Sequence, residues 1–319
     1  MRALPLGCAL CLALAAPAEA QQGMPQIGFL SHCTSSFDEE GFKQGLRELG
    51  YVEGKTIDIA WRRFLTDATQ LSSAADELVR ANVAIIVTCS TPATRAALAA
   101  TKTIPVVFTA TGDPVATGLA VSLSRPGANA TGVSIQGSDL AAKRLDLLRQ
   151  LVPRARRVGF IGNASNPGRV PAMKALHAAA GTLHIKLQTY NVGKTAELDS
   201  ALRAIPWKSM DGALIGADLV TLTQGDKIAQ AIRKARLPAV FPWRQFHEYG
   251  ALMSYGPDSR ELMHRGAYYV DKILKGAKPA DLPIEQVSKV NLVIDLRVAR
   301  EMGIEVPPEL LYRADEVIR

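Results

Sequence analysis

Short apolar segments alternate with amphipathic segments along most of this chain, and polar loops separate them. The apolar segments are rich in Val, Ile and Phe, as buried strands are, and the amphipathic ones have helical periodicity. Strands are expected at 27–30, 57–61, 83–88 and 104–108, and a second run of strands at 157–161, 184–190, 212–216 and 239–241. Strands that alternate with helices form parallel sheets with right-handed crossovers. The sequence therefore predicts an α/β protein with two doubly wound parallel-sheet lobes.

The last part of the chain does not simply continue either run. It has a strand at 251–255, a helix at 259–274 and a strand at 290–294. We expect these segments to return first to one lobe and then to the other, which gives three hinge crossings near 132–138, 249–252 and 284–290. The N-terminal lobe then comprises 25–134 and 251–286, the C-terminal lobe comprises 135–250 and 287–319, and the protein is expected to be a monomer.

The N-terminus has the layout of a secretory signal peptide. Arg2 gives a positive start, residues 3–16 are almost wholly apolar, and residues 18–20 (Ala-Glu-Ala) offer a small-x-small cleavage site. This apolar stretch is too short to span a bilayer. We expect cleavage near Ala20 and a periplasmic mature protein, and the alternative is an apolar N-terminal helix that stays in place.

Composition and motifs exclude several classes of function. The chain has 319 residues, 48% of them hydrophobic, and a formal net charge of +7. Its basic residues are scattered and not gathered in a stripe with aromatics, so we expect solvated surface and no nucleic-acid partner. The sequence has no G-x-S-x-G elbow, no phosphate-binding loop, no G-x-G-x-x-G and no His pair at metal-ligand spacing. We therefore expect no catalytic residue, no metal and no cofactor.

Polar residues collect where the expected strands end. Ligands of doubly wound sheets bind beyond the carboxyl ends of the strands, where helix N-termini converge. The alternative for any one residue is helix capping, and Trp243 could equally be a core residue. A set drawn from both lobes favours a small-molecule site in the crevice between them. The candidate ligand-binding residues are Ser31, Ser35, Cys89, Ser90, Thr91, Thr109, Thr111, Asp113, Ser134, Asn163, Asn166, Asp218, Trp243 and Tyr255.

The chemistry of this set points to an amino acid or a related organic acid. Ser90 or Thr91 is the expected N-cap of a helix whose start also carries Pro92, and a helix N-terminus suits a carboxylate. Asp218 could pair with an ammonium group. Trp243 and Tyr255, together with Phe37, could cover an apolar or aromatic portion of the ligand.

Two cysteines, Cys33 and Cys89, remain after the expected cleavage. Each directly follows or lies near the end of an expected strand. They form either a disulfide at the edge of the crevice or two small buried thiols.

Several stretches of the mature chain form a specific pattern. They include 27–31 (Ile-Gly-Phe-Leu-Ser), 45–55 (Gly-Leu-Arg-Glu-Leu-Gly-Tyr-Val-Glu-Gly-Lys), 103–108, 112–115, 125–127, 131–134, 253–256, 273–276, 279–283 and 313–318. This pattern resembles ABC-transporter substrate-binding proteins of the tryptophan/tyrosine type. The resemblance implies a type I periplasmic binding fold, a small-molecule ligand and delivery to the membrane permease of an ABC transporter. His32 and Cys33 stand where relatives often carry small hydroxyl or glycine residues, which leaves the ligand open.

Three functions compete at this point. The first is a transport binding protein, and the second is an exported sensor that passes ligand occupancy to a membrane signalling protein. The third is a hydrolase or lyase that uses the same crevice. The missing catalytic motifs argue against the third.

Overall fold

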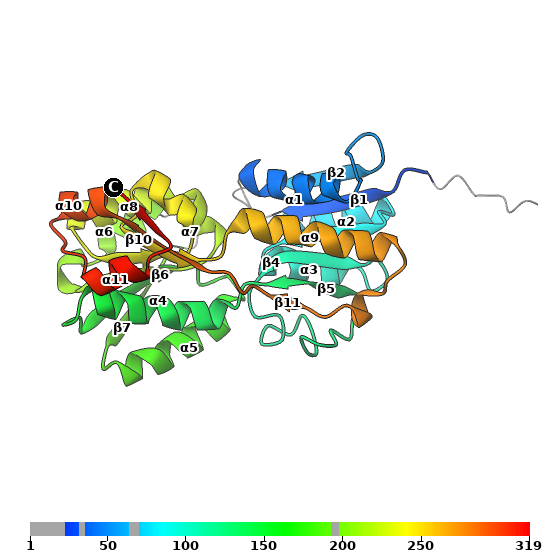
Figure 1. Ribbon diagram of the computed structural model, residues 1–319. Coiled ribbons are helices and arrows are strands. Elements are labelled where there is room, and N and C mark those ends of the chain that lie inside the picture. Colours follow the sequence, from blue (N-terminus) through cyan, green and yellow to red (C-terminus); the bar gives the residue numbers. More distant parts are fainter. Residues whose placement is uncertain (1–22, 32–35, 64–69, 193–197) are drawn as a thin grey trace, which may run out of the picture.

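The computed structural model describes residues 23–31, 36–63, 70–192 and 198–319. These residues form two α/β lobes that lie side by side and are joined at the centre by connecting segments of the chain (Figure 1). The expected signal peptide lies outside the described residues. No described helix is long and apolar enough to cross a membrane.

The first lobe contains a sheet with the order β11-β5-β4-β3-β1-β2, in which every pair of neighbours is parallel. Its helices cover both faces, because alternate residues of each strand point to opposite sides. Ile27 and Phe29 pack with α1 and α9, whereas Leu30 packs with α2 and α3. The elements are β1 (Gln26–Ser31), α1 (Ser36–Glu48), β2 (Asp58–Arg63), α2 (Gln70–Arg80), β3 (Ile85–Cys89), α3 (Thr91–Ala100), β4 (Val106–Thr111), β5 (Ala130–Ser134), α9 (Ser259–Leu274), η4 (Pro279–Asp281) and β11 (Glu285–Gln286).

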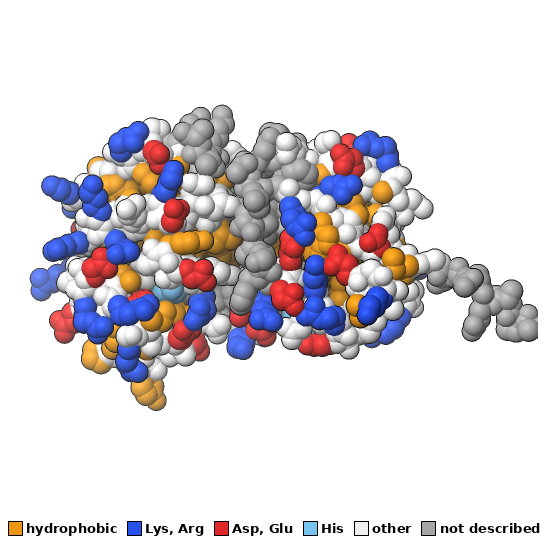
Figure 2. All heavy atoms as spheres, turned by 90° about the horizontal axis from the view of Figure 1, so that it is seen from above, with side chains coloured by type: hydrophobic (Ala, Val, Ile, Leu, Met, Phe, Trp, Pro, Cys, Tyr) orange, Lys and Arg blue, Asp and Glu red, His pale blue; other side chains and the backbone are white. Residues whose placement is uncertain are grey.

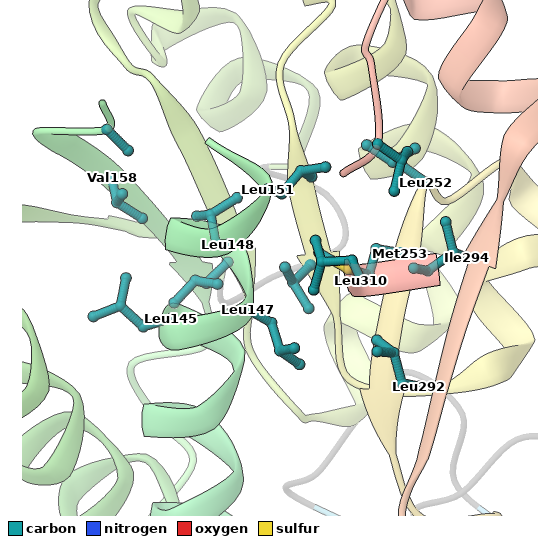
Figure 3. Close-up of a cluster of buried hydrophobic side chains, with 14 of the residues drawn as sticks. Leu145, Leu147, Leu148, Leu151, Val158, Leu252, Met253, Leu292, Ile294 and Leu310 are labelled. Carbon is teal, nitrogen blue, oxygen red and sulfur yellow. The ribbon is translucent and has the colours of Figure 1, made fainter. Parts of the chain in front are cut away.

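The second lobe contains a sheet with the order β13-β12-β10-β9-β8-β6-β7. Its elements are α4 (Gly137–Leu151), β6 (Arg157–Gly162), α5 (Arg169–Thr182), β7 (Lys186–Asn191), α6 (Leu198–Ala204), η2 (Trp207–Ser209), β8 (Gly212–Ile215), α7 (Leu219–Thr223), α8 (Gly225–Ala235), β9 (Ala239–Phe241), η3 (Arg244–Tyr249), β10 (Met253–Gly256), β12 (Asn291–Asp295), α10 (Leu296–Met302), α11 (Pro308–Arg313) and β13 (Glu316–Ile318). The leucines of α4 form the centre of one core cluster, facing Met253 of β10 and Ile294 of β12 (Figure 3).

The chain crosses between the lobes three times, as predicted. The first crossing, between β5 and α4, lies within the expected 132–138, and the third, between β11 and β12, overlaps the expected 284–290. The second was expected near 249–252, and this was wrong: β10 pairs with β9 and β12, so the chain leaves the second lobe only after Gly256. An apolar run such as 251–256 can join either sheet, and here its packing against α4 decides.

The alternation of strands and helices predicted a wholly parallel second sheet, and this was wrong. β12 runs antiparallel to β10, whereas the other neighbouring strands of this sheet are parallel. The direction follows from the path of the chain. β12 enters from the other lobe, so it starts at the edge where the parallel strands end and must run back along them. β11 instead follows α9, which has already carried the chain away from the hinge, and it is therefore parallel to β5.

Charged side chains are interspersed over the surface of both lobes. On the face shown in Figure 2, Lys and Arg alternate with Asp and Glu, and no stripe of one sign runs across the molecule. Many are paired, as in Arg244 with Glu316 and Arg233 with Glu301. The basic residues on this face are therefore scattered, solvated surface residues, as the sequence predicted.

Replacing glycine by alanine should have opposite effects on the free energy of unfolding at two positions. Gly132 on β5 has φ 145°, and an added Cβ would lie 1.9 Å from the Phe108 carbonyl oxygen of β4. Gly132→Ala should lower the free energy of unfolding by about 2 kcal/mol or more. Gly181 lies in α5 with nothing near its Cβ position, and Gly181→Ala should raise the free energy of unfolding by about 0.5–1 kcal/mol. Urea denaturation measures both, and equal effects would contradict the prediction.

Candidate functional site

A pocket opens between the two lobes, at the edge where the parallel strands of both sheets end. It is lined by the residues that follow β3, β4, β6, β8 and β9, and by side chains of α4, α5 and α9. Half of the residues predicted from the sequence lie in this lining: Cys89, Ser90, Thr91, Asn163, Asn166, Asp218 and Trp243. The structure thus brings together predicted residues from both lobes.

The first lobe contributes the N-terminus of α3. Ser90 is its N-cap, and the Ser90 Oγ accepts a hydrogen bond from the backbone N–H of Ala93 at 3.4 Å. The backbone of Ser90 has φ 95°, a conformation that costs a non-glycine residue about 1–3 kcal/mol. Thr91 Oγ1 accepts from the Gly112 N–H at 3.1 Å and thereby joins α3 to the loop after β4. Pro92 has no N–H and the Ala93 N–H is already bound to Ser90 Oγ, so an anion at this end of α3 is favoured mainly by the helix dipole and the Ser90 hydroxyl.

The second lobe contributes a buried carboxylate, Asp218. It is the N-cap of α7, only 9% exposed, and accepts hydrogen bonds from the N–H groups of Thr221 and Asn163, each at 3.1 Å. Burial raises the pKa of Asp218 to about 6, because the loss of water outweighs these hydrogen bonds and the charge of Arg169. A carboxylate has room for more than two donors, so Asp218 can still accept from a ligand.

A buried arginine, Arg144, also lines the pocket from α4. Only 4% of the residue is exposed. Its Nε donates to the Tyr255 carbonyl oxygen at 2.7 Å and its Nη2 to that of Pro242 at 3.4 Å. Burial lowers the pKa of Arg144 to about 10, and it remains charged at neutral pH.

The two lobes approach each other closely beside the pocket. A Cβ on Gly168, which caps α5 in the second lobe, would lie 3.2 Å from Thr91 Oγ1 of the first lobe. Ser138, at the start of α4, donates from its N–H to the Asp113 carboxylate at 3.0 Å. The N-termini of α3 and α5 therefore meet across the crevice, and both present their positive ends to it.

Six of the predicted residues lie outside the pocket lining: Ser31, Thr109, Thr111, Asp113, Ser134 and Tyr255. Several of them form hydrogen bonds within their own lobe or between the lobes instead. Thr109 Oγ1 donates to the Thr88 carbonyl oxygen and contacts Met263, and Thr111 Oγ1 pairs with Thr94 Oγ1. Tyr255 offers its carbonyl oxygen to Arg144. The position of a residue at a strand end does not tell whether its side chain points into the lobe or into the crevice.

Three further predictions concern residues whose structure is only partly described. Ser35 and Cys33 lie outside the described residues, and so does the side chain of Phe37. Cys89 is disulfide-bonded, so it is not a free thiol, and its partner lies outside the described part of the chain.

Sequence reasoning missed Arg144 and several apolar residues of the lining, among them Phe160, Leu176 and Leu214. The signal for Arg144 was present: it lies on the apolar face of an amphipathic helix, four residues from both Leu140 and Leu148, which are buried. The apolar residues carried no such signal, because they resemble any other core positions. Among the described residues, no group of His, Cys, Asp or Glu side chains could hold a metal ion.

Residues 26–318 match the family described as ABC transporter substrate binding protein. The chain belongs to this family. A "Tyrosine-binding protein" from Clostridioides difficile is 26% identical over 86% of this chain and 78% of its own length. The crystal structure of an ABC domain from Streptococcus pneumoniae in complex with L-Trp is 26% identical, with a TM-score of 0.86 over 92% of this chain and 99% of that one.

A conserved domain protein from Vibrio cholerae has a similar crystal structure. It is 27% identical, again with a TM-score of 0.86 over 92% of this chain and 99% of that one. The two lobes with three crossings are thus the type I periplasmic binding fold that the resemblance implied. This substrate-binding protein belongs to a family of solute-binding proteins and not of enzymes.

The raised pKa of Asp218 predicts how the stability of the ligand-free protein depends on pH. A folded-state pKa near 6, against about 3.9 in the unfolded chain, means that the folded state holds its proton longer. Asp218 therefore lowers the free energy of unfolding progressively between about pH 4 and pH 6, by up to about 3 kcal/mol. The Asp218→Asn variant keeps an N-cap side chain and loses this dependence.

Urea denaturation of both proteins between pH 4 and pH 7 measures this effect. The wild type should become less stable relative to the variant as the pH rises. A stability difference that does not change with pH would contradict the assignment.

Proposed function

We propose that this protein is the extracytoplasmic solute-binding protein of an ABC importer, that it binds an amino acid with an aromatic side chain, and that it delivers this ligand to a membrane permease. The observation that carries the proposal is the pocket between the lobes, where the N-terminus of α3, a buried carboxylate and apolar side chains meet. Family membership supports the transport role. The L-Trp complex and the tyrosine-binding relative support the ligand class.

The polar groups of the pocket suit the two ends of an amino acid. A ligand carboxylate can accept from the Ser90 hydroxyl at the N-terminus of α3, where the helix dipole favours negative charge. A ligand ammonium can donate to Asp218, which lies on the other side of the crevice. A charge held on each side would draw the lobes together around the ligand.

The apolar part of the pocket suits the ligand's side chain. Phe160, Leu176 and Leu214 line it from the second lobe, and Leu262 and Met263 line it from the first. The ring of Trp243 is only partly buried and stacks on Phe246, with the ring centroids 6.2 Å apart. An aromatic ligand side chain would bury its own apolar surface against these groups, which favours binding by about 25 cal/mol per Å² of apolar surface.

Removing the Ser90 hydroxyl should weaken binding of L-tryptophan about tenfold or more, since a hydrogen bond to a charged group contributes about 1.5–3 kcal/mol. Ser90→Ala and Ser90→Gly both test this by calorimetric titration. Glycine accepts φ 95° without strain, so Ser90→Gly should weaken binding without destabilising the ligand-free protein. A Ser90→Gly variant with wild-type affinity would contradict the role of the hydroxyl.

Ligand binding should hold the two lobes in one closed arrangement, because groups from both lobes contact the ligand. Small-angle scattering of the ligand-free protein and of the protein saturated with L-tryptophan tests this. The radius of gyration should be smaller with ligand. An unchanged radius with ligand shown to be bound would contradict hinge closure.

A further inference from the structure

The charge of Arg144 has no counter-ion among the described residues. Its Nε and Nη2 donate to two backbone carbonyl oxygens, which are neutral. No described carboxylate forms an ion pair with it, and no described residue accepts from its Nη1. Arg144 lines the pocket, and its Nη1 is not fully enclosed by protein atoms. A buried charge of this kind is unfavourable unless an anion binds to it.

The two carbonyl bonds fix where the guanidinium lies. Pro242 directly follows β9 and Tyr255 lies near the end of β10, so Arg144 reaches the carboxyl edge of the second sheet. Asp218 lies at the same edge, beyond the neighbouring strand β8. Arg144 and Asp218 are thus two buried, opposite charges on one edge of one sheet. They form no ion pair with each other.

Their separation suits a zwitterion. The guanidinium is bound at the ends of β9 and β10, and the Asp218 carboxylate follows β8 and accepts from Asn163 beyond β6. Neighbouring strands lie about 5 Å apart, so about two strand spacings, roughly 10 Å, separate the two positions. An α-amino acid with one hydrogen bond of about 2.9 Å at each charged end spans about 9 Å. One ligand can therefore contact both groups.

We propose that Arg144 is a specificity-determining residue that binds the carboxylate of the ligand, while Asp218 binds the ammonium group of the same molecule. This inference rests on the proposed function and adds the residue that recognises the ligand carboxylate. The carboxylate is then held from both lobes, by the N-terminus of α3 and by Arg144. The site selects zwitterionic amino acids over amines and over simple acids, because each of those leaves one buried charge without a partner.

Arg169 serves as a comparison for the carboxylate preference, although its charge also acts on Asp218. It lines the same pocket and carries the same charge, but it is partly exposed and lies over the ring of Phe160, with its Cζ 5.6 Å from the ring centroid. Water can therefore solvate the charge of Arg169 when no ligand is bound, but it cannot do so to the same extent for Arg144. The proposal requires Arg144→Gln and Arg169→Gln to differ.

The experiment titrates wild type, Arg144→Gln, Arg169→Gln and Asp218→Asn with three probes: L-tryptophan, tryptamine, which lacks the carboxylate, and indole-3-propionate, which lacks the ammonium group. The wild type should prefer L-tryptophan to both analogues. Arg144→Gln should reduce the preference over tryptamine about ten- to a hundredfold and leave the affinity for tryptamine nearly unchanged. Asp218→Asn should reduce the preference over indole-3-propionate instead. Arg169→Gln should change the preference over tryptamine by less than Arg144→Gln does.

The outcomes separate the inference from the proposed function. Thermal unfolding of ligand-free Arg144→Gln shows that the variant folds, and a purely structural role would lower its affinity for all three probes alike. That result, or a full preference over tryptamine in Arg144→Gln, overturns the inference alone. A wild-type protein that binds neither L-tryptophan nor indole-3-propionate overturns the proposed function and this inference with it. A wild type that binds indole-3-propionate but not L-tryptophan, with binding lost in Arg144→Gln, overturns the amino-acid ligand and supports Arg144 as the acid-binding residue.

Discussion

Parallel strands all end at the same edge of their sheet, and the rest of this structure depends on that constraint. Each lobe gathers the loops after its strands, and the N-termini of the helices that follow them, at one edge. The three crossings leave both lobes at these edges and so turn them toward each other. The N-termini of α3 and α5 consequently meet across the crevice, beside Gly168 and Thr91. Polar groups from distant parts of the chain converge there without any local sequence motif.

The pocket holds groups that the ligand-free fold does not fully satisfy. Arg144 is a buried cation whose hydrogen-bond partners among the described residues are neutral carbonyl oxygens, and Asp218 is a buried carboxylate whose pKa is raised to about 6. Ser90 has a backbone conformation that is unfavourable for its residue type. Each of these features lowers stability, and each lies where a ligand can compensate for it. The two large cores of the lobes supply the stability that lets the fold hold them in place.

The sequence predicted the local elements better than it predicted their partners. Alternating apolar and amphipathic segments indicated the strands and helices of both lobes, and the small polar residues after them indicated where the site lies. Residues 251–256 were placed in the wrong lobe, because an apolar run shows that a strand is buried but not which sheet it joins. The antiparallel direction of β12 was missed for a similar reason: it depends on the edge at which the chain enters the second lobe. Thr109 and Thr111 follow the same polar pattern as Ser90, yet they turn into the first lobe.

The sequence by itself determined the α/β class, the two lobes and their three crossings, because hydrophobic periodicity and chain order are local properties. It also determined the chemistry at the strand ends, including a helix cap at Ser90 or Thr91 and Asp218 as a candidate carboxylate. Only the tertiary structure decided which of these side chains share one pocket. It alone showed that Arg144, on the apolar face of α4, reaches that pocket, because burial and the absence of a counter-ion depend on what packs around a residue and not on its neighbours in the chain.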